Sequence, residues 1–248
     1  LFFIYMSFIQ YYLIHNLEEE REKHMSMMFE KYGIKKKDVK YINHPNKNEL
    51  TYKIKKDSVR KKAKIKDGWI SCSYKHYLAL EDIVKNKYEL AVIMEDNIGD
   101  FYESVPNRLK KYLKLLPNDW GIVFDSVWGD YKSHNEEELK DDKLLYKKSN
   151  EPTFDENNKL ISHGSTRAAQ FYFINLETAK SLYNNFLPFN HSADMWMNYI
   201  IRKNNINVYW SEPSLVTSKF NKQTSTNLQI KDLPYKVKSE LINLALGI

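Results

Sequence analysis

Three consecutive side chains that carry oxygen atoms follow a buried apolar segment near the middle of the chain. Residues 90–94 read LAVIM, and Glu95, Asp96 and Asn97 come directly after them. Carboxylate and amide oxygens are the ligands that hard divalent cations prefer. A cation held there could bridge a diphosphate and neutralise the charge that grows on a departing nucleotide. Residues of these types also follow strands as turn formers and helix caps, so the 95–97 segment is predicted to be either a cation site or a turn.

The elements that must position these side chains alternate between strands and helices. Apolar periodicity predicts strands over residues 11–17, 39–43, 90–94, 120–124, 170–175 and 206–210. Helices are predicted over residues 18–32, 71–87, 101–116, 176–186, 193–203 and 234–246. This alternation indicates an α/β domain with a mostly parallel central sheet flanked by helices. Ligands of such sheets bind beyond the carboxyl ends of the strands, which is where residues 95–97 lie, and Asp125 ends the 120–124 strand in the same way.

Length and composition fit a globular protein with one domain or two small ones. The chain has 248 residues, of which 42% are hydrophobic and 28% are charged, and this composition excludes a disordered protein. Cys72 is the single cysteine, which excludes an intrachain disulfide framework and a zinc cluster built on cysteines. A reducing, cytoplasmic compartment is expected.

The first seventeen residues are mostly apolar but contain several polar residues. A bilayer span needs about 20 apolar residues, and no basic region precedes this segment as it would in a secretory signal. We expect residues 1–10 to be an apolar extension with at most peripheral membrane contact; the alternative is the stub of a trimmed anchor. At the other end, residues 229–248 are predicted to form a helical tail that packs on the domain.

Positive charge is concentrated in the lysine-rich residues 53–66, within a net charge of +6 and a pI of about 9.0. A basic stretch can bind nucleic acid, but few aromatic residues are interleaved here to stack on bases. The abundance of Lys, Asn, Ile and Tyr is also typical of an AT-rich genome, which would raise the pI without a functional cause. We therefore expect residues 44–68, which contain this stretch, to form a solvated loop or a surface helix, and we expect no nucleic-acid partner.

Several segments resemble, in the right order, the glycosyltransferases of family 25, which include lipooligosaccharide and collagen galactosyltransferases. Residues 14–17 (IHNL), followed by Arg21, resemble the family's opening INL…R strand and helix. Residues 68–76 (GWISCSYKH) resemble its G-x-x-x-C-x-x-S-H helix start, and residues 92–97 (VIMEDN) resemble its ILEDD motif. Further matches are residues 117–120 (PNDW), 171–174 (FYFI) and 213–216 (PSLV). The resemblance covers about residues 11–228.

This resemblance implies a single GT-A-type, Rossmann-like domain over residues 11–228. Such an enzyme would transfer a hexose, galactose or glucose, from a UDP-sugar to a glycan or glycoprotein hydroxyl with inversion. The donor-binding residues that the resemblance implies are Asn16, Arg21, His76, Glu95 and Asp125. Asp96 and Asn97 would be ligands of Mn²⁺ or Mg²⁺, and Asp194 would be the general base that takes the acceptor's proton.

Each implied role has a structural alternative. Arg21 could form a fork with a phosphate or a surface salt bridge with Glu18. His76 could touch the donor or acceptor, or be a satisfied residue of a helix. Asp194 could be a helix N-cap instead of the general base. Asp125 is then the other candidate for the general base.

Two residues depart from the family pattern. Asn97 stands where related transferases have a third carboxylate, so weaker metal binding is expected. Lys75 places a cation where the family has a serine hydroxyl. We favour the hypothesis that the protein is an active glycosyltransferase. The alternative is a non-catalytic relative that binds a glycan or a nucleotide. Three kinds of acceptor are compatible with the sequence: lipooligosaccharide, a collagen-like protein and a viral surface glycan.

Overall fold

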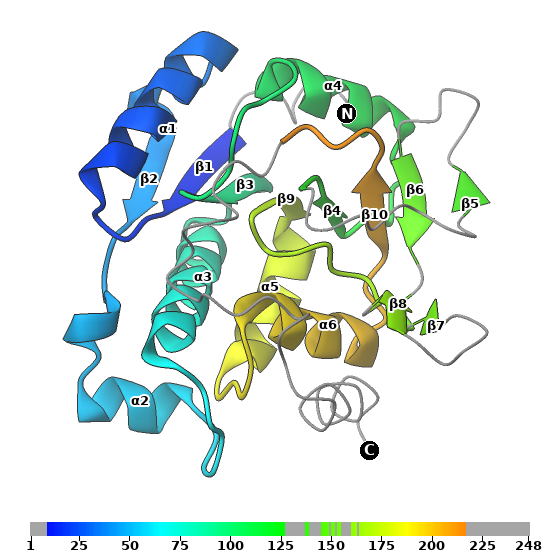
Figure 1. Ribbon diagram of the computed structural model, residues 1–248. Coiled ribbons are helices and arrows are strands. Elements are labelled where there is room, and N and C mark those ends of the chain that lie inside the picture. The colour runs from blue at the N-terminus through cyan, green and yellow to red at the C-terminus, as the bar shows by residue number, and fades with distance from the viewer. Residues whose placement is uncertain are drawn as a thin grey trace.

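The computed structural model describes residues 9–126, 137–138, 145–148, 150–151, 153–154, 160–162 and 164–216. An eight-stranded sheet in the order β2-β1-β3-β9-β4-β10-β6-β5 forms its centre (Figure 1). The predicted extension over residues 1–10 falls mostly outside the described residues. The C-terminal helix over 234–246 and the tail over 229–248 lie wholly outside them.

Strands and helices follow one another along the chain largely as the sequence predicts. The strands are β1 (Ile9–Ile14), β2 (Val39–Ile42), β3 (Leu90–Glu95), β4 (Ile122–Phe124), β5 (Glu137–Glu138), β6 (Leu145–Lys148), β7 (Thr153–Phe154), β8 (Leu160–Ser162), β9 (Phe171–Asn175) and β10 (Val208–Ser211). The helices are α1 (Glu19–Tyr32), α2 (Tyr52–Ser58), α3 (Asp67–Asn86), α4 (Val105–Leu115), α5 (Leu176–Phe186) and α6 (Ala193–Lys203), with 3-10 turns η1 (Lys36–Asp38) and η2 (Lys47–Glu49). The α/β class is confirmed.

Most boundary differences have local causes. The first strand ends at Ile14 instead of residue 17, because His15 and Asn16 turn away from the sheet and Leu17 takes a positive φ of 67°. The helix predicted from residue 71 begins four residues earlier, at Asp67. The helix predicted from residue 101 begins at Val105, and Pro106 lies in its first turn, where a missing N–H costs nothing.

The sheet is mixed. Strand β1 pairs in parallel with β2 and β3, and β10 pairs in parallel with β4. Strand β9 lies between β3 and β4 and is antiparallel to both, with Val92 opposite Phe173. Strands β1, β2, β3, β4 and β10 therefore share one direction, whereas β9 runs against β3 and β4, and β6 runs against β10 and β5.

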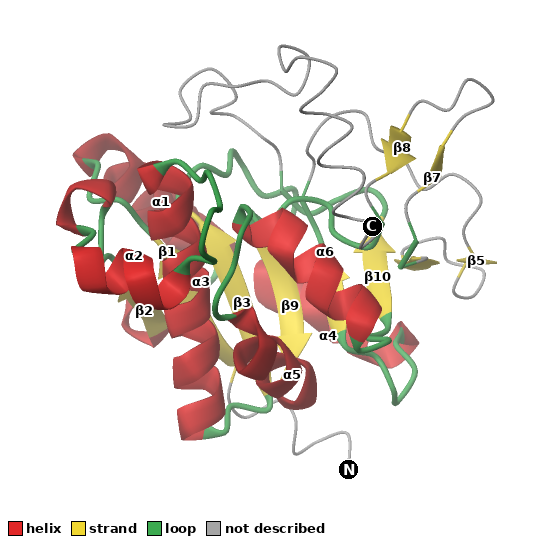
Figure 2. Ribbon diagram, turned by 90° about the horizontal axis from the view of Figure 1, so that it is seen from below, coloured by secondary structure: helices red, strands yellow, loops and turns green. Residues whose placement is uncertain are grey.

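Two hydrophobic layers cover the two faces of this sheet. Alternation along β1 sends Tyr12 into the layer shared with α3, α5 and α6, and Leu13 into the layer shared with α1 and α4. Figure 2 shows α3, α5 and α6 packed along the strands on one side. None of the described helices is both long and apolar enough to cross a membrane. Because hydrophobic layers cover both faces of the sheet, polar side chains can gather at the ends of the strands.

Candidate functional site

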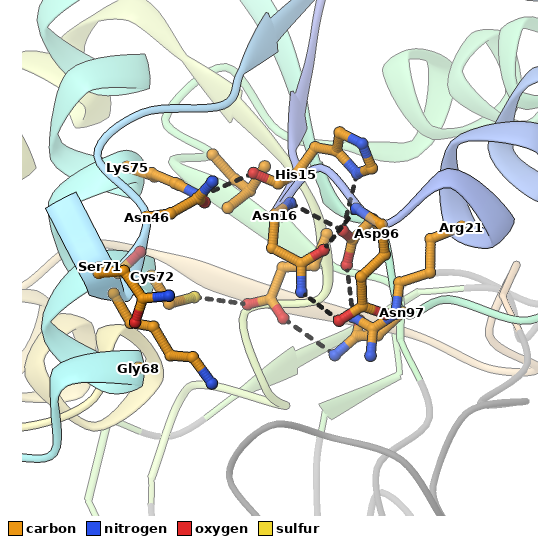
Figure 3. Close-up of a pocket in the computed structure, with 15 residues that line it drawn as sticks. His15, Asn16, Arg21, Asn46, Gly68, Ser71, Cys72, Lys75, Asp96 and Asn97 are labelled. Carbon is orange, nitrogen blue, oxygen red and sulfur yellow. Dashed lines mark hydrogen bonds and ion pairs between the residues drawn. The ribbon is translucent and has the colours of Figure 1, made fainter.

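A cavity of about 270 Å³ opens at the carboxyl ends of the parallel strands β1 and β3 (Figure 3). The chain passes from β1 to β2 on one side and then crosses back to β3 on the other, so β1 and β3 flank the point where the strand order reverses. Open α/β sheets bind their ligands at such a point. The residues that line the cavity are Ile14, His15, Asn16, Glu18, Arg21, Asn46, Lys47, Asn48, Gly68, Ser71, Cys72, Lys75, Glu95, Asp96 and Asn97.

Asp96 is held inward by three buried or half-buried donors. His15 Nδ1 lies 2.8 Å from Oδ2, the Asn16 backbone N–H donates to the same oxygen at 3.0 Å, and Arg21 Nη1 donates to Oδ1 at 2.8 Å. Burial alone would raise the pKa of Asp96, but the His15 hydrogen bond and the Arg21 charge outweigh it and hold the pKa below its usual value. Asp96 is thus a 4% exposed ion-pair partner that ties β3 to the turn after β1 and to α1.

Glu95 and Asn97, on either side of Asp96, face the cavity. The Asn97 amide donates to Glu95 Oε2 at 3.2 Å, and Glu95 Oε1 lies 3.2 Å from His76 Nε2 and 3.6 Å from Cys72 Sγ. Asn97 Oδ1 has no hydrogen-bond partner within the described part of the chain. That oxygen is therefore available to accept a hydrogen bond from a ligand.

The expected metal ligands Asp96 and Asn97 do not fit a Mn²⁺ or Mg²⁺ site as a pair. Both carboxylate oxygens of Asp96 already accept from Arg21, His15 and the Asn16 backbone, which leaves only the Asn97 amide oxygen free. Hard cations need several oxygen ligands that are free to turn toward them.

Lys75 is the least expected member of the cavity wall. It lies on α3, is 2% exposed, and donates from Nζ to the His15 carbonyl oxygen at 2.7 Å and to Asn46 Oδ1 at 2.6 Å. Burial lowers its pKa, although the charges of Cys72 and Asp96 oppose that effect. Among the described residues it forms no ion pair with a carboxylate, and one of its three N–H groups has no protein acceptor. The sequence predicts the cation at this position but not its burial.

Arg21 lines the cavity, whereas His76 lies outside the cavity wall and has protein partners at both ring nitrogens. Arg21 Nε pairs with Glu18 at 2.8 Å, so the predicted salt bridge exists, while the same side chain also holds Asp96 and lines the cavity. His76 is fully buried behind Glu95 and contacts Tyr172 Oη at 3.0 Å through Nδ1. The Asn16 side-chain amide donates a hydrogen bond to Glu18, and the Asn16 backbone N–H donates one to Asp96.

Asp125 and Asp194 lie outside the cavity wall. Asp125 is completely buried, where it accepts hydrogen bonds from Tyr112 Oη and the Leu215 backbone N–H, and burial raises its pKa to about 7. Asp194 is in the first turn of α6 and accepts from Ser192 Oγ at 2.6 Å. Ser192 occupies the N-cap position, so the predicted N-cap alternative for Asp194 is wrong.

Sequence reasoning missed the part of the wall formed by residues 46–48. The sequence predicts a solvated loop or surface helix over residues 44–68. The structure shows a 3-10 turn, helix α2 and a cavity-lining segment there. The one local signal is the capping box in which Asn46 and Glu49 bond to each other's backbone N–H groups.

The sequence matches the profile of one known enzyme family. The sequence profile of glycosyltransferase family 25, described as an LPS biosynthesis protein, matches residues 9–197. One solved structure with similarity to the chain is entitled "Crystal structure of a glycosyltransferase involved in the glycosylation of the major capsid of PBCV-1"; the match covers 97% of this chain and 100% of that one, at 8% identity and a TM-score of 0.44. No curated protein matches the sequence. The profile match spans more than half of the chain and confirms the predicted enzyme class. The chain therefore belongs to glycosyltransferase family 25.

Proposed function

We propose that the cavity between β1 and β3 binds a UDP-sugar, and that the enzyme transfers its hexose, galactose or glucose, to a hydroxyl of a glycan or glycoprotein. The observation that carries this proposal is the buried Lys75 ammonium in the cavity wall, which has two uncharged acceptors and a third N–H free. A buried cation is costly unless it is paired. A phosphate oxygen of the donor supplies the missing anion.

The free polar atoms of the cavity match the two chemical ends of such a donor. Lys75 offers an N–H to a phosphate, and Asn97 Oδ1 offers an acceptor to a hydroxyl of the sugar or ribose. Lys47 lies exposed at the rim on η2 and adds positive charge where a diphosphate would enter. Arg21 is already neutralised by Asp96 and Glu18, so its contribution is to fix the wall.

In the proposed reaction, the acceptor oxygen attacks the anomeric carbon from the side opposite the diphosphate. The bond between the anomeric carbon and the phosphate oxygen breaks, and its electron pair stays on the departing UDP. The Lys75 ammonium stabilises that charge where it develops. The configuration at the anomeric carbon is inverted by this single displacement.

Asp194 is the proposed general base that takes the acceptor's proton. It is half-exposed in the first turn of α6, and its charge acts on Cys72, which lines the cavity. A base of this type contributes about 10²- to 10⁴-fold to the rate.

The test is calorimetric titration of the purified chain with UDP, followed by assays of UDP release from UDP-galactose and UDP-glucose with a glycan acceptor. We expect UDP to bind and one of the two sugar nucleotides to be turned over, with an inverted anomeric configuration of the product by NMR. The absence of UDP binding would overturn the proposal for the cavity. UDP binding with no turnover of either donor would leave a non-catalytic binding protein and overturn the proposal for transfer.

A further inference from the structure

We propose that Cys72, His76 and Glu95 form a binding site for a zinc-class transition-metal ion in the wall of the cavity. The three candidate ligand atoms, one from each side chain, all lie within 4.8 Å of one another. Cys72 and His76 are one turn apart on α3, and Glu95 is the last residue of β3. Spacing of four residues on a helix puts both side chains on the same face.

The distances between these atoms match the edges of a metal-centred tetrahedron. With zinc–ligand bonds of about 2.0–2.3 Å, ligand atoms of a tetrahedral site lie roughly 3.3–3.7 Å apart. Glu95 Oε1 lies 3.2 Å from His76 Nε2 and 3.6 Å from Cys72 Sγ. Two of the three separations therefore fit a tetrahedral site as they stand. The atoms of Cys72 and His76 lie within 4.8 Å of each other, and a bound ion would draw that pair together.

The donor set selects the kind of ion. A sulfur, an imidazole nitrogen and one carboxylate oxygen suit Zn²⁺, whereas Mn²⁺ and Mg²⁺ prefer sites made of oxygen. Three protein ligands leave the fourth position of a tetrahedral ion open, as in catalytic zinc sites. Cys72 and Glu95 line the cavity and His76 is buried behind them, so the open position faces the cavity.

Residues behind the three ligands are arranged to hold them. His76 Nδ1 lies 3.0 Å from Tyr172 Oη, an outer partner of the kind that fixes the ring of a metal-bound histidine. The Asn97 amide donates to Glu95 Oε2 at 3.2 Å and leaves Oε1 toward Cys72 and His76. A carboxylate in place of Asn97 could not donate this bond, which gives the departure from the family pattern a physical role.

Binding of the ion exchanges protons for metal bonds. The Cys72 thiol loses its proton to solvent as the sulfur–metal bond forms. The Nε2 proton that faces Glu95 in the metal-free protein leaves Nε2, and the neutral ring carries its proton on Nδ1 instead. The Nε2 lone pair then binds the ion, and Nδ1–H donates a hydrogen bond to Tyr172 Oη. Glu95 binds as the carboxylate, and no electron is transferred.

Cobalt titration of tag-free, chelator-treated protein tests this site, because Co²⁺ replaces Zn²⁺ and reports its ligands by absorption. Cys72 is the single cysteine of the chain, so a thiolate-to-cobalt charge-transfer band can come only from this site. We expect one equivalent of Co²⁺ to produce the band, one equivalent of Zn²⁺ to remove it, and Cys72→Ser to abolish it. Ser71→Ala is the matched control, since Ser71 neighbours Cys72 and lines the cavity without belonging to the ligand set; it should keep the band.

Tyr172→Phe removes only the outer partner of His76 and should weaken zinc binding about 10- to 100-fold. A wild-type titration without a thiolate band overturns the site, and that result needs no variant to fold. Metal binding and the proposed donor binding can fail separately. Protein that binds UDP but gives no band refutes this inference alone, and protein that gives the band but binds no UDP refutes the donor cavity alone.

Discussion

Replacement of Lys75 by methionine removes the buried ammonium and keeps an unbranched side chain of similar length. In the proposed complex, the third N–H of Lys75 bonds to a donor phosphate. A hydrogen bond to a charged group contributes about 1.5–3 kcal/mol, so Lys75→Met should raise the Kd for UDP roughly 10- to 150-fold. The matched control is Lys47→Met, which removes a cation from the exposed rim of the same cavity. An exposed charge contributes about 0–1 kcal/mol, which limits that change to roughly 5-fold.

The effect of Lys75→Met on folding should be smaller than its effect on binding. The His15 carbonyl oxygen and Asn46 Oδ1 each lose a donor, at about 1–3 kcal/mol if they stay unsatisfied. Removal of a cation whose pKa is lowered by burial acts in the opposite direction. We expect the free energy of unfolding to change by at most about 2 kcal/mol, measured by urea denaturation.

The pH dependence gives a second readout of the same residue. Burial lowers the pKa of Lys75 in the free protein, and a bound phosphate would raise it again. UDP affinity should therefore be highest below the lowered pKa of Lys75 and fall as the pH rises through it, at a lower pH than for an ordinary lysine. Lys75→Met should lack this alkaline loss. Calorimetric titration of both proteins across this range measures it, and a folded Lys75→Met protein that binds UDP as tightly as the wild type would refute the reasoning.

Three further predictions concern catalysis and stability. Asp194→Asn should lower kcat about 10²- to 10⁴-fold with little change in UDP affinity; steady-state kinetics beside calorimetry check this, and an unchanged kcat would remove Asp194 as the base. Asp96→Asn should cost about 1–3 kcal/mol of stability, because the buried Arg21 keeps Glu18 but loses the buried carboxylate that accepts from its Nη1. Since the pKa of Asp96 is lowered in the fold, its contribution is complete above the unfolded value of about 3.9 and is lost as the pH falls through the folded value. Denaturation curves in acid should therefore show a larger loss of stability in the wild type than in Asp96→Asn. Gly121→Ala should cost about 1–3 kcal/mol by overpacking, because a Cβ there would lie 2.7 Å from Thr178 Oγ1 and 2.9 Å from the Asn207 carbonyl oxygen; an unchanged melting temperature would contradict it.

The parts of the fold that the sequence predicts best are those set by neighbouring residues. The apolar run over residues 90–94 is typical of a strand covered on both faces, and it is β3 near the centre of the sheet. Helix α5 has the predicted bounds because Asn175 caps it, accepting a hydrogen bond from the Thr178 backbone N–H. Local chemistry fixes these elements without reference to the rest of the chain.

The parts that the sequence does not predict depend on residues far apart in the chain. The antiparallel placement of β9 between β3 and β4 brings together segments that are far apart in the chain, and no local pattern encodes it. The residues next to Asp96 in sequence suggest a metal ligand, but its carboxylate accepts a hydrogen bond from Arg21, 75 residues away in sequence. The burial of Lys75 likewise depends on Asn46, which a polar, basic stretch of sequence gives no reason to place at a cavity.

The central claim is that the cavity between β1 and β3 is the donor site, and a crystal structure of the chain with UDP tests it most directly. The account predicts electron density for the diphosphate inside the cavity, with a phosphate oxygen within hydrogen-bonding distance of Lys75 Nζ. Density for UDP elsewhere on the protein, with the cavity empty and Lys75 still bound only to His15 and Asn46, would contradict it.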